Sequence, residues 1–306
     1  MTLNRIISFL PSATEILYEI GAGKSVQAVT HRCTYPDDAK TKPKVITSPI
    51  DTECMNSAEI DAANSKMQHI QNSAFMLDED LVRRIDPDLI ISQNTCVACA
   101  AHTTHVGNAI RVLDKKPKLY EMNPHTVSEI IDSISDLARM VGLEKRGVDL
   151  VKSLRVRISN VSKKCTDTPP RVMILEWIDP VYTAGHWVPD MVEAAGGINL
   201  ISKSGERSRK TNIQEIAMAD PDIIIVMVCG FDIIRSSSEY NTTLALSKEW
   251  CTLRAVREDR VFTIDADSYA SKPSHRVVTG IEILSKVIHP KLTLDVKVPK
   301  NSFAHL

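Results

Sequence analysis

Four of the seven cysteines in the sequence follow segments that are typical of buried β-strands. They are Cys33 after residues 26–29, Cys96 and Cys99 after residues 89–92, and Cys229 at the end of the strand that begins at Ile223. In open parallel sheets, ligands bind beyond the carboxyl ends of the strands. The positions of these thiols therefore predict that they converge on one site.

Cys96 also begins a Cys-x2-Cys-x2-His-x2-His pattern that ends at His105. Thiolate and imidazole groups are ligands of zinc, iron–sulfur clusters and other thiophilic centres. A plainer interpretation is that small free cysteines pack at strand ends and that the histidines are ordinary helix residues. Because no second Cys-x2-Cys completes a structural zinc pattern, both interpretations stay open. The remaining cysteines lack such a placement and receive no role: Cys54, Cys165 and Cys251.

A repeat indicates which elements position these residues. Residues 81–91 return in similar form as residues 213–225, and both copies contain Asp-Pro-Asp. Each copy is typical of an amphipathic helix that Asp-Pro ends, followed at once by a buried strand. The copies are separated by the length of a whole domain, which is too long for a solenoid repeat and predicts two related α/β halves.

The starts of the two halves are also alike. Arg5–Leu10 and Arg171–Leu175 are short apolar strands that lead toward helices. In the first half, we expect Ser12 to cap the next helix in a capping box with Glu15. In the second half, the segment from Gly185 to Asp190 leads into a helix that ends at Gly196-Gly197.

Helical spacing of apolar residues from His125 to about Lys164 predicts a long helix, with an interruption at Gly142, that joins the halves. The predicted fold class is therefore α/β, with two Rossmann-like lobes, central mostly parallel sheets, a long bridging α-helix and a ligand cleft between the lobes. The predicted domains are an N-terminal α/β lobe, a bridging helix, and a C-terminal α/β lobe with a C-terminal helix and tail: residues 1–122, 123–164 and 165–306.

Composition excludes several classes of protein. The formal net charge is −1, from 37 Lys and Arg against 38 Asp and Glu, which argues against nucleic-acid binding. The longest apolar run, Ile223 to Cys229, is far shorter than the roughly 20 residues that a membrane span requires. The N-terminal residues show no signal-peptide pattern, and the odd cysteine count suits a reducing compartment. We therefore expect a cytoplasmic protein, or an extracytoplasmic one if the N-terminus is truncated.

Several motifs along the chain resemble a known family. The opening Arg5–Ile16 and the later His31–Pro36 look like the start of the class III substrate-binding proteins of ABC importers, and most closely their cobalamin-binding branch. Further matches cover nearly the whole chain: Ser57–Asp61, Leu175–Pro180, Ala184–Pro189, Cys229–Asp232 and Gly280–Leu284.

The resemblance implies two α/β lobes bridged by a stiff helix, with a small-molecule ligand held between them and an ABC permease as a candidate partner. It also implies a set of ligand-binding residues by position: Ser12, Thr14, His31, Arg32, Tyr35, Gln93, Glu176, Trp177, His186, Trp187, Phe231, Tyr269 and Arg276.

Four of these residues are aromatic, and they fit a flat ligand. Trp177, Trp187, Phe231 and Tyr269 would give a corrin or another flat macrocycle broad apolar walls, although aromatic residues could equally seal the domain interface. His186 could bind a metal or the cobalt of a corrinoid through its imidazole. Alternatively, His186 caps the helix that follows it.

These residues are compatible with three functions. The preferred one is non-catalytic binding of a corrinoid, cobalamin-like, or a related metal-containing ligand. The alternative is a metalloprotein that holds an iron–sulfur cluster or zinc through Cys33, Cys96, Cys99 and Cys229. A hydrolase is third, because the sequence has no Gly-x-Ser-x-Gly, no His-Glu-x-x-His and no phosphate-binding glycine loop.

Overall fold

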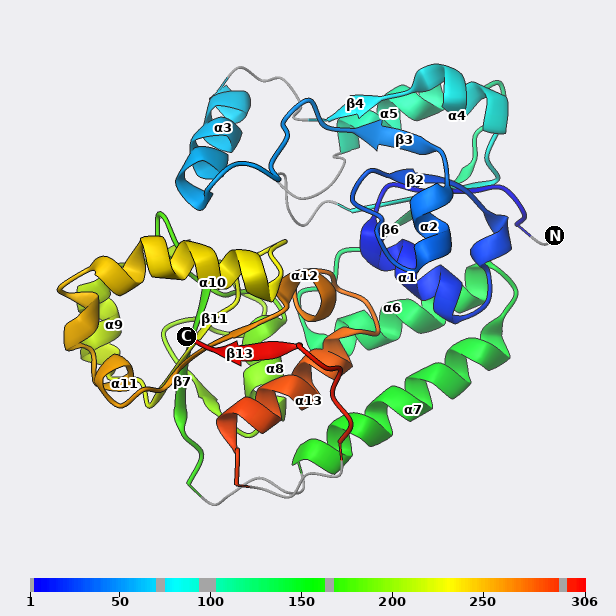
Figure 1. Ribbon diagram of the computed structural model, residues 1–306. Helices are drawn as coiled ribbons and strands as arrows, with labels where there is room; N and C mark the ends of the chain where they lie inside the picture. The colour runs from blue at the N-terminus through cyan, green and yellow to red at the C-terminus, as the bar shows by residue number, and fades with distance from the viewer. Residues whose placement is uncertain (1–2, 70–74, 94–102, 163–167, 292–295) are drawn as a thin grey trace. The chain divides into compact units, whose positions relative to one another are not determined.

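A computed structural model describes residues 3–69, 75–93, 103–162, 168–291 and 296–306 (Figure 1). The chain divides into two compact units. Unit 1 consists of Met1–Met55, Ala62–Pro124 and Glu129–Lys152, and unit 2 of Asn56–Asp61, His125–Ser128 and Ser153–Leu306. No helix within the described ranges is long and apolar enough to cross a bilayer.

The sheet of unit 1 has the strand order β4-β3-β2-β1-β5-β6. Neighbouring strands are parallel except for the antiparallel pair β3 and β4. The strands are β1 (Ile6–Ser8), β2 (Val26–Thr30), β3 (Lys44–Thr47), β4 (Met76–Leu77), β5 (Leu89–Ser92) and β6 (Lys118–Glu121).

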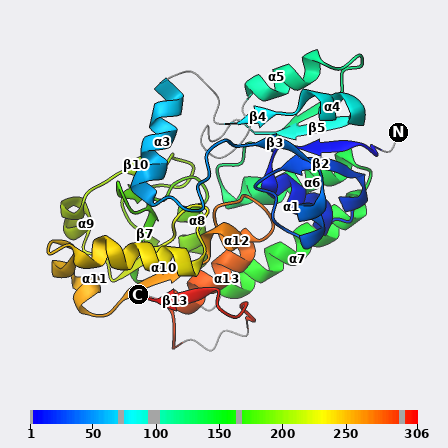
Figure 2. The ribbon, with the colours of Figure 1, turned by 45° about the horizontal axis from the view of Figure 1, so that its top comes forward.

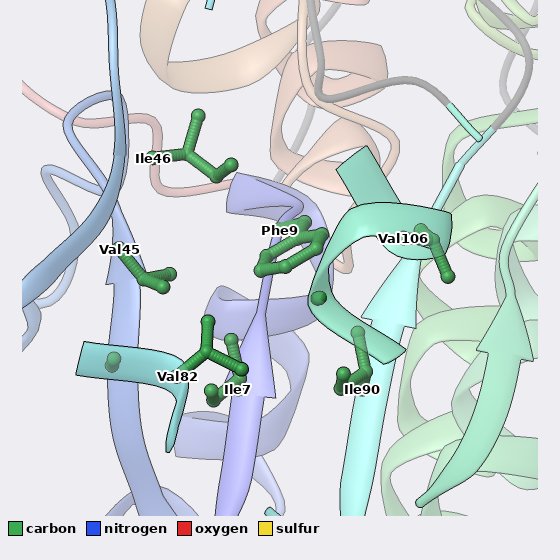
Figure 3. Close-up of a cluster of buried hydrophobic side chains, with 9 residues drawn as sticks. Ile7, Phe9, Val45, Ile46, Val82, Ile90 and Val106 are labelled. Atoms are coloured by element: carbon green, nitrogen blue, oxygen red, sulfur yellow. The ribbon is translucent and has the colours of Figure 1, made fainter. Parts of the chain in front are cut away.

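The helices of the first half of the chain lie between and after these strands (Figures 1 and 2). They are α1 (Pro11–Glu19), η1 (Gly23–Ser25), α2 (Asp37–Thr41), α3 (Ser57–His69), α4 (Glu79–Ile85), α5 (Thr103–Arg111), α6 (Val127–Met140) and α7 (Glu144–Ser162). Helices α4 and α5 pack on the sheet, and Figure 3 shows Val82 and Val106 from these helices facing Ile7, Phe9 and Ile90. All five side chains are buried, and together with their neighbours they form a core of unit 1.

The sheet of unit 2 has the order β10-β8-β7-β11-β12-β13, with β9 paired to β7. Strands β7, β11 and β12 are mutually parallel, whereas β8, β10 and β13 pair antiparallel with their neighbours. The strands are β7 (Arg171–Trp177), β8 (Tyr182–Thr183), β9 (Ile198–Asn199), β10 (Arg209–Lys210), β11 (Ile223–Val226), β12 (Val261–Ile264) and β13 (Phe303–His305).

The helices of unit 2 alternate with its strands. They are α8 (Val188–Ala194), α9 (Ile213–Ala219), α10 (Ile233–Thr242), η2 (Leu244–Leu246), η3 (Trp250–Thr252), α11 (Arg254–Arg257), α12 (Ala266–Tyr269) and α13 (Val277–Ile288). The predicted α/β class with two central, mostly parallel sheets is confirmed, since Ile90 and Ile224 lie in separate sheets.

The repeated Asp-Pro-Asp segments have the predicted structure. Helices α4 and α9 end at Asp86 and Asp220, which take left-handed backbone angles with φ of 46° and 42°. Aspartate is one of the few residues that tolerates this conformation at a helix end. The proline that follows stops each helix, and β5 or β11 begins two residues later.

Each Asp-Pro-Asp segment is clamped to the arginine that begins the neighbouring central strand. Asp88 accepts a hydrogen bond from the Arg5 backbone N–H at 3.1 Å, and its own N–H donates to the Arg5 carbonyl at 2.8 Å. In unit 2, Asp222 accepts from the Arg171 backbone N–H at 2.7 Å and donates to the Arg171 carbonyl at 2.8 Å. The Arg5 guanidinium holds the pKa of Asp88 below its ordinary value.

The start of α1 differs from the prediction, whereas the break between α6 and α7 agrees with it. The capping box at Ser12 is wrong, because α1 begins at Pro11, Leu10 is its N-cap residue, and no side chain caps the helix. Proline lacks an N–H and has a helical φ, so Pro11 takes the first helical position and Ser12 falls inside the helix. The predicted interruption at Gly142 is confirmed, since α6 and α7 are separate helices and Gly142 has a φ of 71°.

Replacement of Gly147 by alanine tests the packing of α7 against α6. The added Cβ of Gly147→Ala would lie 2.3 Å from the Ala138 Cβ. We expect this overpacking to lower the free energy of unfolding by about 1 to 3 kcal/mol. Gly107→Ala in α5 is the matched control within unit 1, because nothing lies within 4 Å of its added Cβ.

The control should be neutral or stabilising by up to about 1 kcal/mol, since alanine favours a helix over glycine. Urea unfolding followed by circular dichroism measures both variants. Equal stability of the two would contradict the close approach of α6 and α7.

Candidate functional site

The first turn of α1 in unit 1 holds a buried hydroxyl group. Ser12, in the first turn of α1 after β1, is 1% exposed, and its Oγ has no hydrogen-bond partner among the described residues. A buried hydroxyl without a hydrogen-bond partner costs about 1 to 3 kcal/mol. Thr14, two residues further along the chain, has a partner already, since its hydroxyl donates to the Leu10 carbonyl at 3.2 Å.

Cys33 follows β2 and is part of the interior of unit 1. The residue is 1% exposed, and its Sγ lies 3.3 Å from Thr14 Oγ1 and 3.4 Å from Thr30 Oγ1. Burial raises the pKa of the Cys33 thiol. Since a metal binds the thiolate and not the thiol, this environment disfavours the ligating form.

The other candidate residues of unit 1 differ in exposure. His31 is half-buried, donates from Nδ1 to the Ile46 carbonyl at 3.3 Å, and has its pKa lowered by burial. Arg32 is half-buried, Tyr35 is 41% exposed, and Gln93 is buried directly after β5. The carboxyl ends of β2 and β5 thus present a guanidinium, a phenol and an amide.

In unit 2, Glu176 anchors the loop that carries His186 and Trp187. Its carboxylate accepts a hydrogen bond from the Gly185 N–H at 3.2 Å and from Ser208 Oγ at 2.9 Å. A Cβ at Gly185 would lie 2.3 Å from the Ser208 nitrogen, so only glycine permits this close approach of the two loops. Burial raises the pKa of Glu176.

The four candidate aromatic residues of unit 2 separate into two kinds. Trp187 and Phe231 are only 8% and 2% exposed, and the Trp187 Nε1 donates to the Ala270 carbonyl at 2.8 Å. Trp177 and Tyr269 are only half-buried. Trp177 and Tyr269 are therefore the better candidates for contact with a flat ligand.

Cation–ring contacts orient this aromatic group. The Arg235 guanidinium lies 3.7 Å from the Phe231 ring centre, and the Phe231 ring lies 5.6 Å from that of Trp177. The Arg276 guanidinium lies 4.9 Å from the Tyr269 ring centre. These cations bring positive charge to the carboxyl ends of β11 and β12.

His186 contacts a histidine that the sequence did not indicate. Its Nδ1 lies 3.2 Å from Nδ1 of His125, a residue 61 positions earlier in the chain. Burial, with smaller effects of His125 and Arg207, lowers the pKa of His186 to about 4. The expectation that His186 caps the next helix is wrong, because Trp187 is the N-cap residue of α8 and no side chain caps it.

The predicted cysteine centre lies partly outside the described residues, since both Cys96 and Cys99 fall in the range 94–102. Cys229 is half-buried after β11, and its backbone N–H donates to the Glu176 carbonyl at 3.0 Å. Among the residues whose positions are described, no group of three or more His, Cys, Asp or Glu is arranged to hold a metal ion. Convergence of the four thiols stays a prediction.

Comparisons with known proteins cover nearly the whole chain. The family model described as "Periplasmic binding protein" matches residues 6–268. The chain is 25% identical over 297 residues to an uncharacterized ABC transporter substrate-binding lipoprotein of Bacillus subtilis, covering 94% of this chain and 80% of the relative. It is 24% identical over 289 residues to the vitamin B12-binding protein of Vibrio cholerae, covering 91% of this chain and 86% of that protein.

A solved structure confirms the fold at lower identity. A periplasmic heme binding protein from Pseudomonas aeruginosa superposes with a TM-score of 0.74 at 14% identity, covering 97% of this chain and 96% of that one.

Glu176→Gln tests the buried carboxyl group. Because burial raises its pKa above the ordinary 4.5, the folded protein keeps the Glu176 proton to a higher pH than the unfolded chain does. The stability from this group is fully present below pH 4.5 and is lost as the pH rises through the raised folded pKa. The melting temperature of Glu176→Gln should therefore rise relative to that of the wild type as the pH increases above 4.5.

Differential scanning calorimetry across this pH range measures the difference. Glu193→Gln, at an exposed glutamate of α8, is the control and should follow the wild-type curve. Parallel curves for Glu176→Gln and the wild type would contradict the raised pKa of Glu176.

Proposed function

The chain belongs to the periplasmic binding protein family, and on this premise we propose that it binds a corrinoid of the vitamin B12 class. It is a binding protein rather than an enzyme, as its relatives are. The observation that carries the corrinoid proposal is the match to a vitamin B12-binding protein over most of both chains. Heme is the second candidate, since a heme binding protein has the same fold.

Unit 2 supplies the apolar part of the proposed binding surface. A corrin and a porphyrin are both flat macrocycles, and a flat ring gains from contact with accessible aromatic faces. The half-buried residues Trp177 and Tyr269 are the candidates for this contact, while Trp187 and Phe231 are buried and Phe231 packs against Trp177. His186, Glu176 and Arg276 complete the candidate residues of unit 2.

Unit 1 supplies polar groups suited to the rim of a corrinoid, which carries amide side chains. Gln93 and the Ser12 hydroxyl both donate and accept hydrogen bonds, and Ser12 Oγ has no partner among the described residues. Arg32 would donate to the amide oxygens, and it would pair equally with the propionates of heme. These residues, with Thr14, His31 and Tyr35, therefore set the choice between the two ligands.

The relatives also bear on the partner and the location. A relative named as an ABC transporter substrate-binding lipoprotein supports delivery of the ligand to an ABC permease. The family description and that name favour an extracytoplasmic location over the cytoplasmic one expected from the N-terminal residues. The comparisons give no support to the iron–sulfur or zinc alternative.

Ligand titration tests the proposed function. Cobinamide, cobalamin and heme are each added to ligand-free protein, and binding is followed by calorimetry and by the visible spectrum. We expect saturable binding of a corrinoid with one ligand per chain. No heat and no spectral change with either corrinoid would contradict the proposal, and saturable binding of heme alone would transfer the function to heme.

Tyr269→Ala tests the aromatic contact. Loss of an accessible ring from the binding surface should weaken corrinoid binding by about 1 to 2 kcal/mol, or roughly 5-fold to 30-fold in Kd. Phe262→Ala is the control, because Phe262 is a half-buried aromatic residue within β12, whereas Tyr269 follows the carboxyl end of that strand. Equal Kd values for the two variants would exclude Tyr269 from the binding surface.

A further inference from the structure

The fold of unit 2 brings two imidazole groups together. The Nδ1 atoms of His125 and His186 lie 3.2 Å apart, and the ring centres are 5.4 Å apart with planes inclined by 30°. His125 lies two residues before the start of α6, and His186 lies between β8 and α8. The pair therefore exists only in the folded protein.

The backbone around His186 is held firmly. His186 has a φ of 53°, an unfavourable conformation for this residue type. Its N–H donates to the Glu206 carbonyl at 2.6 Å, and its carbonyl accepts from the Gly205 N–H at 3.0 Å. The neighbouring Gly185 is bound to Glu176. These contacts compensate for the strain and fix the direction in which the His186 side chain leaves the backbone.

The backbone next to His125 is fixed by a different contact. The Val127 N–H, at the start of α6, donates to Oδ2 of Asp190 in α8 at 2.9 Å. His125 lies two residues before this anchor, and His186 lies two residues before the start of α8. The two imidazoles thus lie in the segments that lead into the two helices that this hydrogen bond joins, which preorganises the pair.

The separation of the two nitrogen atoms suits a shared cation. Two imidazole nitrogens bound to one tetrahedral cation at about 2.0 to 2.1 Å are separated by about 3.3 Å. The observed 3.2 Å requires almost no movement. Neutral imidazole is the ligating form of histidine.

We propose that Nδ1 of His125 and Nδ1 of His186 form a binding site for a divalent transition-metal cation of the zinc, nickel and copper class. Imidazole is a preferred ligand of these metals. In the metal-free pair, one Nδ1–H is donated to the other Nδ1. On binding, that proton moves through solvent to Nε2 of the same ring, so both Nδ1 lone pairs face the metal and no net proton is released.

The surroundings limit the affinity of the site. Within the described ranges, no third His, Cys, Asp or Glu joins the pair, so water completes the coordination shell. Arg207 is the nearby cation that helps to lower the pKa of His186, but its side chain is exposed and its charge is screened by solvent. Two protein ligands with open positions suit a weak, exchangeable cation.

Metal titration of the ligand-free chain tests this site. Zn²⁺, Ni²⁺ and Cu²⁺ are titrated separately into the wild type, His125→Ala and His186→Asn by calorimetry in a buffer that does not bind metals. Asparagine is chosen at position 186 because it tolerates a left-handed backbone. His305→Ala, at an exposed histidine of β13, is the control variant.

We expect the wild type and His305→Ala to bind one cation equally, and both His125→Ala and His186→Asn to bind it at least tenfold more weakly. The electron paramagnetic resonance spectrum of the Cu²⁺ complex should show two nitrogen ligands in the wild type and fewer in each variant. Circular dichroism confirms that the variants are folded. Unchanged affinity in either variant, or no binding by the wild type, would overturn the proposal without bearing on corrinoid binding, since no corrinoid is present.

Discussion

The alignment of the central strands in both units depends on one repeated contact, the pairing of an aspartate with the arginine at the start of the neighbouring central strand. Asp88 and Arg5 in unit 1, and Asp222 and Arg171 in unit 2, exchange backbone and side-chain hydrogen bonds at the amino ends of the strands. The pairing fixes the register in which Ile6 faces Leu89 and Val172 faces Ile223. Because a shift of one residue would turn every side chain to the opposite face, this register decides which residues leave the carboxyl ends as loops.

These aspartate–arginine contacts specify the register of the strands more than they stabilise the fold. The ion pairs of these arginines, Arg5 with Asp88 and Arg171 with Asp220, are partly exposed, and such pairs contribute about 0 to 1 kcal/mol. The hydrogen bonds from backbone N–H groups to the carboxylates are different, since they satisfy donors at the amino ends of the strands that would otherwise need water. In unit 2, Arg254 adds a second guanidinium that contacts both Asp220 and Asp222. The same sequence element is thus reinforced differently in the two units.

Local periodicity in the sequence was enough to predict the helices and strands of the repeat, because Asp-Pro ends a helix through steric restrictions that act within a few residues. Local periodicity did not predict the start of α1, because Pro11 occupies the first helical position and leaves Ser12 inside the helix. The pairing of His125 with His186 had no local signal, since the two residues are 61 positions apart and the left-handed backbone of His186 depends on the loop around Glu206. The resemblance named candidate residues by position, but their exposure is set by tertiary packing, which buries Trp187 and leaves Trp177 half-buried.

In unit 2 the candidate polar groups are largely engaged with the protein itself. The indole N–H groups of Trp177 and Trp187 donate to backbone carbonyls, and the Glu176 carboxylate holds Gly185 and Ser208. Such bonds keep the loops rigid, which lowers the entropy cost of binding, but they leave mainly ring faces for a ligand. Ring faces favour any flat macrocycle and distinguish poorly between corrin and porphyrin. Discrimination between the two rings therefore requires hydrogen-bonding groups as well as ring faces, because a site built to bind a polar group of one ligand leaves its own polar group without a partner when the other ligand binds.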